Sequence, residues 1–233
     1  RLRAIPLPRV LTVLHNAGGG TRRHAEELVA YLAKQIVSFS LVPLPDHFVR
    51  LQWDAPNESL QQHYHWPTQS DALLTMLRNI GISHIHYHHL LGVNPEIMLI
   101  PQQLGITYDF TAHDYYTACP QIALVDTHHN YCGEQGLAQC TACLAQRPAP
   151  TGESIEDWRL RHRLFLHNAR YLLTPSRDAA QRLQRYFPTA NLRFAPHLDM
   201  ATDATVPQPH PRRLSTEAHL RILVIGAVNE VKG

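Results

Sequence analysis

The chain has 233 residues, of which 44% are apolar and 17% are charged, an ordinary balance for a globular protein. This length allows one large domain or two small ones, and a formal net charge of +2 gives no indication of nucleic-acid binding. The sequence has no apolar run long enough for a transmembrane helix, and its four cysteines do not indicate a secreted disulfide scaffold. We therefore expect a cytoplasmic protein whose N-terminus, which starts at Arg1, is processed or trimmed.

Short apolar runs alternate with runs of helical spacing along most of the chain. The first pair is a strand at residues 9–15 and, after a glycine-rich turn, a helix at residues 22–33. Prolines are expected to break the chain after the second strand. Further strands are expected at residues 36–44, 61–66, 83–90, 106–112, 171–176 and 192–197. Further helices are expected at residues 70–80, capped by Ser70, and at residues 94–104, 153–168 and 177–187. The alternation predicts an α/β fold with a Rossmann-like, mostly parallel sheet and helices on both faces.

Changes of composition divide the sequence into three parts. Residues 1–201 are expected to form one Rossmann-like domain, and residues 202–219, which are polar and contain three prolines, a linker. Residues 220–233 have the pattern of the first strand and turn of a second α/β domain. Because a strand and a turn cannot bury a core, we expect the sequence to be a fragment that stops just inside that domain.

A glycine-rich turn lies between the first strand and the first helix. It consists of Gly18, Gly19, Gly20 and Thr21. Glycines let the backbone approach a phosphate closely, and the N–H groups of a helix N-terminus attract anions. The turn matches neither the dinucleotide-binding pattern nor the P-loop pattern, so it is either a phosphate-binding turn or a tight turn without a ligand. His15 and Asn16, directly before it, are candidates for substrate binding.

His113 and Asp114 follow the strand expected at residues 106–112. Ligands of open α/β sheets bind in the crevice beyond the carboxyl ends of the strands. We therefore take this pair as the candidate catalytic site, where it orients a substrate hydroxyl or stabilises charge. Tyr115 and Tyr116 add hydroxyl groups and aromatic faces for substrate binding. The alternative is a histidine that only hydrogen-bonds to a neighbouring backbone group.

Three of the 17 histidines, His84, His86 and His88, alternate along one strand and therefore share one of its faces. Three imidazoles on one face are a possible zinc site. A strand of a parallel sheet is covered on both faces, however. We therefore favour an arrangement in which His88 or His89 faces the crevice, with His88 in substrate binding, and the others pack.

All four cysteines occur together in one loop-like segment. They are Cys119, Cys132, Cys140 and Cys143, and the last two form a C-x-x-C pair. Four thiolates in one insertion suit a closed tetrahedral zinc site, which would fold a segment that lacks its own core. An iron–sulfur cluster fits the spacing less well. Buried free cysteines and a redox-active C-x-x-C pair are the other interpretations.

Taken in order, these motifs resemble the N-terminal domain of GT-B glycosyltransferases of the retaining family 4. The matching pieces are residues 10–34, 85–89, 111–116, 173–183, 195–199 and 222–233. The run from His113 through the cysteines is similar to a bacterial subgroup that builds surface polysaccharides. The resemblance implies two Rossmann-like domains around a cleft, with the acceptor on the N-terminal domain and a nucleotide-sugar donor mainly on the other. It also implies that the glycine turn approaches the donor diphosphate, that His113 contacts the donor sugar and that Lys232 offsets the diphosphate charge.

The chain departs from the family at several positions. Ala227 stands where many members have arginine, so one phosphate contact is missing. His-Leu-Asp at residues 197–199 replaces the usual Asn-Gly-Val-Asp. The glutamate-rich motif that holds the nucleotide ribose would follow Gly233. We therefore expect this fragment alone to lack turnover.

The resemblance implies transfer of a sugar to a glycan or lipid-linked acceptor, with retention of configuration at the anomeric carbon. A non-catalytic carbohydrate- or protein-binding module and a sugar-nucleotide epimerase of the same shape are the alternatives. Arg159, Arg161 and Arg163 lie in a basic helix, which either contacts anionic lipid at the cytoplasmic face of a membrane or forms a solvated surface. The sequence leaves the oligomeric state open.

Overall fold

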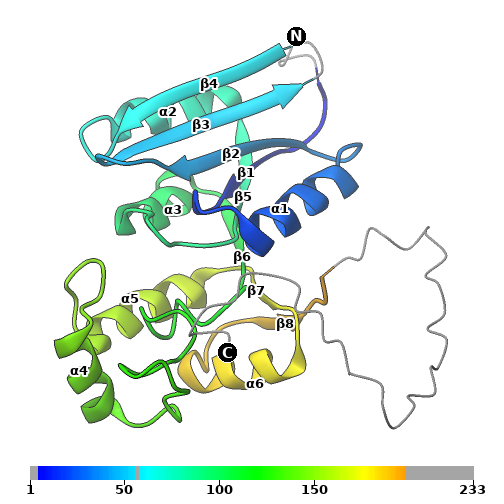
Figure 1. The fold of residues 1–233 in the computed structure, drawn as a ribbon. Coiled ribbons are helices and arrows are strands. Elements are labelled where there is room, and N and C mark those ends of the chain that lie inside the picture. The colour runs from blue at the N-terminus through cyan, green and yellow to red at the C-terminus, as the bar shows by residue number, and fades with distance from the viewer. Residues whose placement is uncertain (1–4, 56–57, 198–233) are drawn as a thin grey trace, which may run out of the picture.

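The computed structural model describes residues 5–55 and 58–197. Within these ranges, eight strands form one sheet in the order β4-β3-β2-β1-β5-β6-β7-β8 (Figure 1). The strands are β1 (Arg9–Val13), β2 (Val37–Pro43), β3 (Phe48–Ala55), β4 (Glu58–His65), β5 (Ile82–Tyr87), β6 (Thr107–Thr111), β7 (Tyr171–Thr174) and β8 (Leu192–Phe194). The α-helices are α1 (Gly19–Tyr31), α2 (Ser70–Ile80), α3 (Ile100–Leu104), α4 (Leu137–Gln146), α5 (Ile155–Asn168) and α6 (Arg177–Tyr186), and a 3₁₀ helix at Pro95–Leu99 leads into α3. The predicted α/β, Rossmann-like architecture is confirmed.

The strand order reverses in the middle of the sheet. β1 pairs in parallel with β2 on one side and with β5 on the other. The sheet continues in parallel from β5 through β6, β7 and β8. A reversal of this kind opens a crevice at the carboxyl ends of the two central strands, where α/β proteins bind ligands. The residues that follow β1 and β5 are therefore the first candidates for ligand binding.

β3 and β4 form an antiparallel hairpin that extends the sheet beyond β2. The strand expected at residues 61–66 is confirmed as part of β4, but the sequence analysis missed β3, because it expected the prolines to break this stretch. β3 has the alternation of a half-buried strand, with Val49 and Leu51 turned into the core. Pro43 is the last residue of β2 and Pro45 lies in the turn that follows, so neither interrupts a strand interior.

α2 buries one apolar face, as its sequence predicts. Leu73, Leu74 and Leu77 are all buried in the core cluster. The prediction that Ser70 caps this helix is wrong. Ser70 is the first helical residue, and Gln69 occupies the N-cap position without a side-chain capping hydrogen bond. A shift of one residue therefore places the serine inside the first turn.

The long connection between β6 and α5 carries the cysteines. It contains α4, whereas the sequence analysis expected only loop. None of the residues of α4 is buried, and the helix lies along one side of α5 (Figure 1). α5 itself is capped by the Ser154 side chain, which accepts a hydrogen bond from the Asp157 N–H, and it buries Trp158 and Phe165. α4 therefore rests on α5 without burying a residue, whereas Leu124 and Val125, earlier in the segment, are buried.

Two of the predicted parts of the chain lie outside the described residues. These are the linker at residues 202–219 and the start of a second domain at residues 220–233, with Lys232. No helix within the described ranges has both the length and the apolar character that a membrane crossing requires.

Candidate functional site

Six histidines gather at the carboxyl edge of the sheet, and we refer to them as the histidine cluster. They are His15 after β1, His24 in α1, His88 and His89 after β5, His113 after β6 and His197 after β8. The centres of neighbouring rings lie between 4.0 and 5.6 Å apart. Four strand ends and the helix after the glycine turn thus meet at one place.

One part of the cluster is built around Asp114. The N–H of Leu91 donates to His89 Nδ1 at 2.9 Å, so the ring proton of His89 is on Nε2. That nitrogen donates to Asp114 Oδ2 at 2.8 Å, and the other carboxylate oxygen accepts the N–H of Tyr116 at 2.9 Å. The ring of His15 lies edge-on to His89, with centres 4.8 Å apart. Both oxygens of Asp114 therefore have partners that fix the orientation of the carboxylate.

The other part of the cluster consists of imidazoles. His88 Nδ1 lies 3.3 Å from His113 Nε2. The ring of His24 lies 5.6 Å from that of His88 and 5.2 Å from that of His113. His197 stacks on His24 with ring centres 4.0 Å apart. One nitrogen from each of His24, His88 and His113 lies within 4.8 Å of the other two.

Burial and neighbouring rings keep this part of the cluster neutral. The pKa of His88 is far below its usual value, first because of burial and then because of the rings of His86 and His113. Burial, together with nearby His24 and His197, lowers the pKa of His113 to about 3. Burial and His197 also lower the pKa of His24. At neutral pH these rings offer N–H donors and lone pairs but no positive charge.

The glycine turn opens onto the same edge of the sheet. Gly18 and Gly19 have φ angles of +71° and +74°, which side-chain-bearing residues rarely adopt. A Cβ atom built at Gly18, Gly19 or Gly20 would meet no atom of the described chain within 4 Å. α1 also begins without a side-chain capping hydrogen bond. The turn therefore presents backbone N–H groups with room for an anion in front of them.

The candidate residues from the sequence fall into two groups. His15, His88, His113, Asp114 and the glycine turn are brought to the carboxyl edge, and Asn16 is exposed beside them. Tyr116 is buried, with its ring 5.1 Å from His89 and 5.0 Å from Trp158, and burial raises its pKa to about 12. Thr21 is buried in α1, and Tyr115 is half-buried. Tyr116 and Thr21 therefore belong to the packing beneath the site.

The other strand histidines are used inside the sheet, as the favoured interpretation predicts. His84 Nδ1 lies 3.0 Å from the Thr107 hydroxyl, and His84 Nε2 lies 3.0 Å from an Asp109 oxygen. His86 Nε2 lies 2.8 Å from the Thr111 hydroxyl. These nitrogens cross-link β5 to β6, so His84, His86 and His88 do not form a shared metal site. Only the last of the three reaches the crevice.

Two members of the cluster were not among the candidates from the sequence. His24 lies in the helix after the glycine turn, and His197 follows the last described strand. A histidine in the second turn of such a helix can face back over the sheet edge, and His197 ends a strand in the way that His113 does. These signals are present in the sequence at both positions. Helical periodicity alone, however, does not predict which strand end a residue in a helix contacts.

The four cysteines are partly buried and unpaired. Burial raises the pKa of the Cys119 thiol to about 11, and the other three thiols act in the same direction, so the four sulfur atoms share one neighbourhood. Arg159 Nη2 lies 3.4 Å from Cys140 Sγ. Among the described residues, the group of three or more ligand atoms close enough to hold an ion contains histidines and no cysteine. A zinc ion would have to draw the sulfur atoms together.

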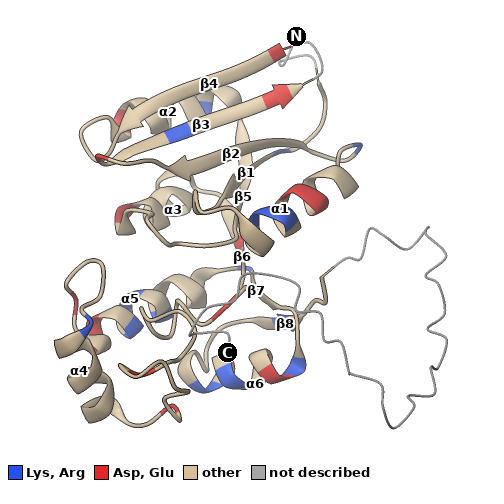
Figure 2. Cartoon of the chain, viewed as in Figure 1, with Lys and Arg blue, Asp and Glu red and all other residues tan. Residues whose placement is uncertain are grey.

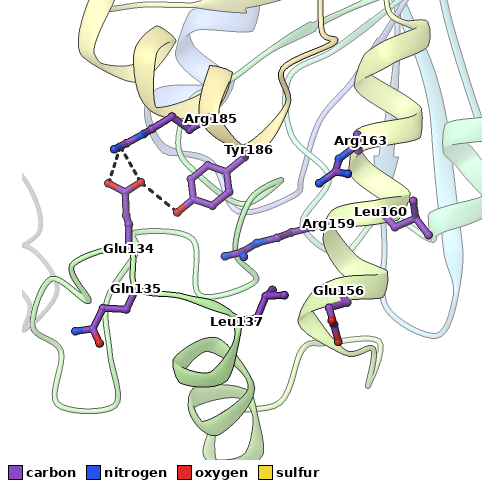
Figure 3. Close-up of a pocket in the computed structure, with 9 residues that line it drawn as sticks. All are labelled: Glu134, Gln135, Leu137, Glu156, Arg159, Leu160, Arg163, Arg185 and Tyr186. Carbon is purple, nitrogen blue, oxygen red and sulfur yellow. Dashed lines mark hydrogen bonds and ion pairs between the residues drawn. The ribbon is translucent and has the colours of Figure 1, made fainter.

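A separate cavity of about 550 Å³ lies between the cysteine segment, α5 and α6 (Figure 3). Both helices contain several arginines, in the blue segments of Figure 2. Glu134 is held at the cavity wall by Arg185 and by the Tyr186 hydroxyl, at 3.0 and 3.1 Å. Arg159 and Arg163 also line it. Arg159 donates to the Ala118 carbonyl at 3.0 Å and Arg161 pairs with Glu153, so two of the three arginines expected on a basic face are used within the protein.

Another cavity, of about 360 Å³, lies beside His15, between α1 and strands β1 to β3. Its wall includes Arg22, Arg50 and Trp53. The Nε of Arg50 is buried and has no hydrogen-bond partner among the described residues. A buried donor of this kind costs free energy unless a ligand or water satisfies it.

Comparisons with known proteins do not assign a family. No protein-family model matches the chain, and no curated protein matches it. Among solved structures, a sucrose-phosphate synthase from Thermosynechococcus elongatus is similar over 81% of this chain, with 14% sequence identity and a TM-score of 0.49. The match covers 48% of that protein, so this chain spans about half its length. A similarity at this level assigns no activity.

Proposed function

We propose that this chain is the acceptor-side half of a GT-B glycosyltransferase that moves a sugar from a nucleotide-sugar donor to a glycan or lipid-linked acceptor, with retention at the anomeric carbon. The proposal rests on one observation. The glycine turn and the His113-Asp114 pair lie together at the carboxyl edge of the sheet, where the strand order reverses. Ring contacts from His15 to His89 and from His24 to His113 join the two. The sequence resemblance assigns these same features to the donor site.

The donor diphosphate is proposed to lie against the N-terminus of α1. Backbone N–H groups and the helix dipole favour negative charge there, and also favour the charge that develops on the leaving diphosphate. The left-handed φ angles at positions 18 and 19 favour glycine, and glycine places no side chain in this space. Because burial lowers the pKa values of His24, His88 and His113 and keeps these rings neutral, further positive charge has to come from other residues. The resemblance gives that role to Lys232.

His113 and Asp114 are proposed to have different roles. His113 is neutral and contacts the donor sugar through a hydrogen bond, and His88 at 3.3 Å holds its ring in place. Both oxygens of Asp114 are already used by the His89 ring and the Tyr116 N–H. Asp114 therefore acts as a positioning residue that fixes His89 at the edge of the site.

The cavity beside His15 is proposed as the acceptor site. Its volume of about 360 Å³ accommodates a sugar unit, and the indole of Trp53 provides an apolar wall. The unsatisfied Nε of Arg50 favours an acceptor with an acidic group, such as a uronic acid or a lipid phosphate.

We also propose that the four cysteines hold a structural zinc ion beside this cleft. The effect of the other three thiols on the pKa of Cys119 and the lack of buried residues in α4 support this proposal. When bound, zinc would supply cross-links to a segment that otherwise has polar contacts and few buried apolar residues, such as Leu124 and Val125.

The test is an assay of transfer and hydrolysis over a panel of nucleotide sugars, using the full-length natural protein that contains these residues. His113→Ala should lower turnover about 100-fold, because the donor sugar loses its orientation. His63→Ala, at an exposed position on β4, is the matched control and should leave turnover unchanged. Carbohydrate binding without turnover of any donor would contradict the transferase proposal and favour a binding module.

A further inference from the structure

Three rings of the histidine cluster come from three different elements and lie close together. His24 comes from the second turn of α1, His88 directly follows β5, and His113 follows β6. Their nitrogen atoms form the one group of potential metal ligands, among the residues the structure describes, that lie within 4.8 Å of one another. No carboxylate belongs to this group.

The spacing of two of these rings already suits a metal ion. Zinc–nitrogen bonds of 2.0–2.1 Å at tetrahedral angles place two ligand nitrogens about 3.3 Å apart. His88 Nδ1 and His113 Nε2 are 3.3 Å apart. The rings of His24 and His113 are 5.2 Å apart between centres, so a small rotation of the half-buried His24 side chain would complete the set.

The backbone holds the group in place. His88 is 1% exposed, and its N–H donates to the Val13 carbonyl at 2.8 Å, which ties it to the end of β1. The residue before His113, Ala112, donates to the Leu173 carbonyl of β7 at 2.9 Å. Ligands on rigid elements lose little freedom when they bind an ion.

The chemistry of the group selects the kind of ion. All three ligand atoms are imidazole nitrogens. Imidazole without carboxylate or thiolate favours zinc, copper, nickel or cobalt over magnesium or calcium. A hydrogen bond between two neutral rings would explain why His88 and His113 are close together. It would not explain why the His24 ring lies beside them.

We propose that His24, His88 and His113 bind one divalent transition-metal ion of the zinc type, with the fourth coordination position open to the crevice. Three protein ligands and one open position are the arrangement of zinc sites that bind a water or substrate oxygen. His197 stacks on His24 and packs against the site as a wall. The proposal does not depend on the transferase activity.

The experiment is a titration of metal-free protein with Zn²⁺ and Co²⁺, in a C140S/C143S background that removes the cysteine site. One equivalent should bind, and Co²⁺ should show visible absorption typical of a nitrogen-ligated tetrahedral ion, without thiolate charge-transfer bands. His24→Ala should weaken binding more than about 100-fold, because loss of a ligand exceeds the effect of losing an outer partner. His63→Ala, on exposed β4, should have no effect.

A second readout guards against variants that fold poorly. Zn²⁺ should shift the imidazole NMR signals of His88 and His113 in the protein with native histidines and leave that of His63 unchanged. Absence of saturable binding in this background, or equal affinity in the parent protein and in His24→Ala, would overturn the proposal.

Discussion

The histidine cluster and the cysteine segment are both rich in metal-binding residue types, but the fold treats them differently. Four of the six histidines, His15, His88, His89 and His113, follow the ends of the neighbouring parallel strands β1, β5 and β6, so the hydrogen-bonded register of the sheet brings them together. The cysteines lie between residues 119 and 143 on loops and on α4, which has no buried residue. The first group is therefore positioned by the core of the protein, whereas the second depends on local contacts.

Many of those local contacts are polar, although Leu124 and Val125 are buried. Glu134 accepts hydrogen bonds from Arg182, Arg185 and Tyr186, which tie the cysteine segment to α6. Arg147 donates to the Asp126 carbonyl at 2.7 Å and so closes the segment on itself. Each contact is modest in water, so we expect the order of this segment to depend on the proposed zinc ion more than that of the other described residues does.

The largest effect is expected from removing the proposed cysteine-bound zinc. Structural zinc contributes about 10 kcal/mol or more to the folding of small zinc-binding peptides, so its loss should disorder a segment with few buried residues. The double variant C140S/C143S should lose one zinc per chain in elemental analysis, and limited proteolysis should then cut between Cys119 and Cys143. His24→Ala should leave that zinc and the segment intact. Four thiols that react freely in native, zinc-free protein would contradict the expectation.

The next effect concerns the support beneath the histidine cluster. Asp109 in β6 is buried and accepts hydrogen bonds from His84 at 3.0 Å and from Arg170. Burial alone would raise the pKa of Asp109, but the His84 and Arg170 hydrogen bonds outweigh it and lower the pKa to about 2. Asp109→Asn should therefore lower the free energy of unfolding by about 2 kcal/mol at pH 7, measured by urea denaturation.

The same carboxylate gives a pH dependence with a defined sign. Because its folded pKa lies below the ordinary value of 3.8, the stability it contributes is fully present above about pH 4 and is lost as the pH falls towards 2. The difference between the parent protein and Asp109→Asn should shrink over that range. Asp54→Asn, at an exposed position of β3, should show no such convergence. A difference that stays constant from pH 5 to pH 2 would contradict the assignment.

The contrast also separates what sequence analysis can predict from what it cannot. The period of apolar residues predicted the parallel core, and the rule for strand ends placed His15, His88 and His113 correctly. The β3–β4 hairpin was missed because prolines at its margins resemble breaks. α4 was missed because a helix without a buried face has no apolar period. His24 was missed because its partners come from other elements, and contacts between elements are set by packing.

A smaller effect is expected at the anchor of the cysteine segment. Glu134→Gln keeps the shape of the side chain but removes the charge that Arg182 and Arg185 contact. Loss of charged hydrogen bonds should raise the rate of proteolytic cleavage within the segment about tenfold, while the rest of the chain stays protected. Glu156 lines the same cavity from the first turn of α5, so Glu156→Gln serves as the control. Equal cleavage of the two variants would show that Glu134 does not anchor the segment.

The smallest effect is expected from alanine substitutions in the glycine turn. They show whether its glycines are needed for backbone conformation or for ligand binding. Gly19 has a φ of +74°, so Gly19→Ala should cost about 1 kcal/mol of stability in urea unfolding. Gly20 lies in α1 without a positive φ, so Gly20→Ala should stabilise the protein by up to about 1 kcal/mol. In both variants the new methyl group enters open space at the N-terminus of α1, where the diphosphate is proposed to bind, so both should weaken nucleotide binding. If Gly20→Ala stabilises the fold and leaves nucleotide affinity unchanged, the turn is a structural βα connection, and the anion must bind elsewhere on the carboxyl edge.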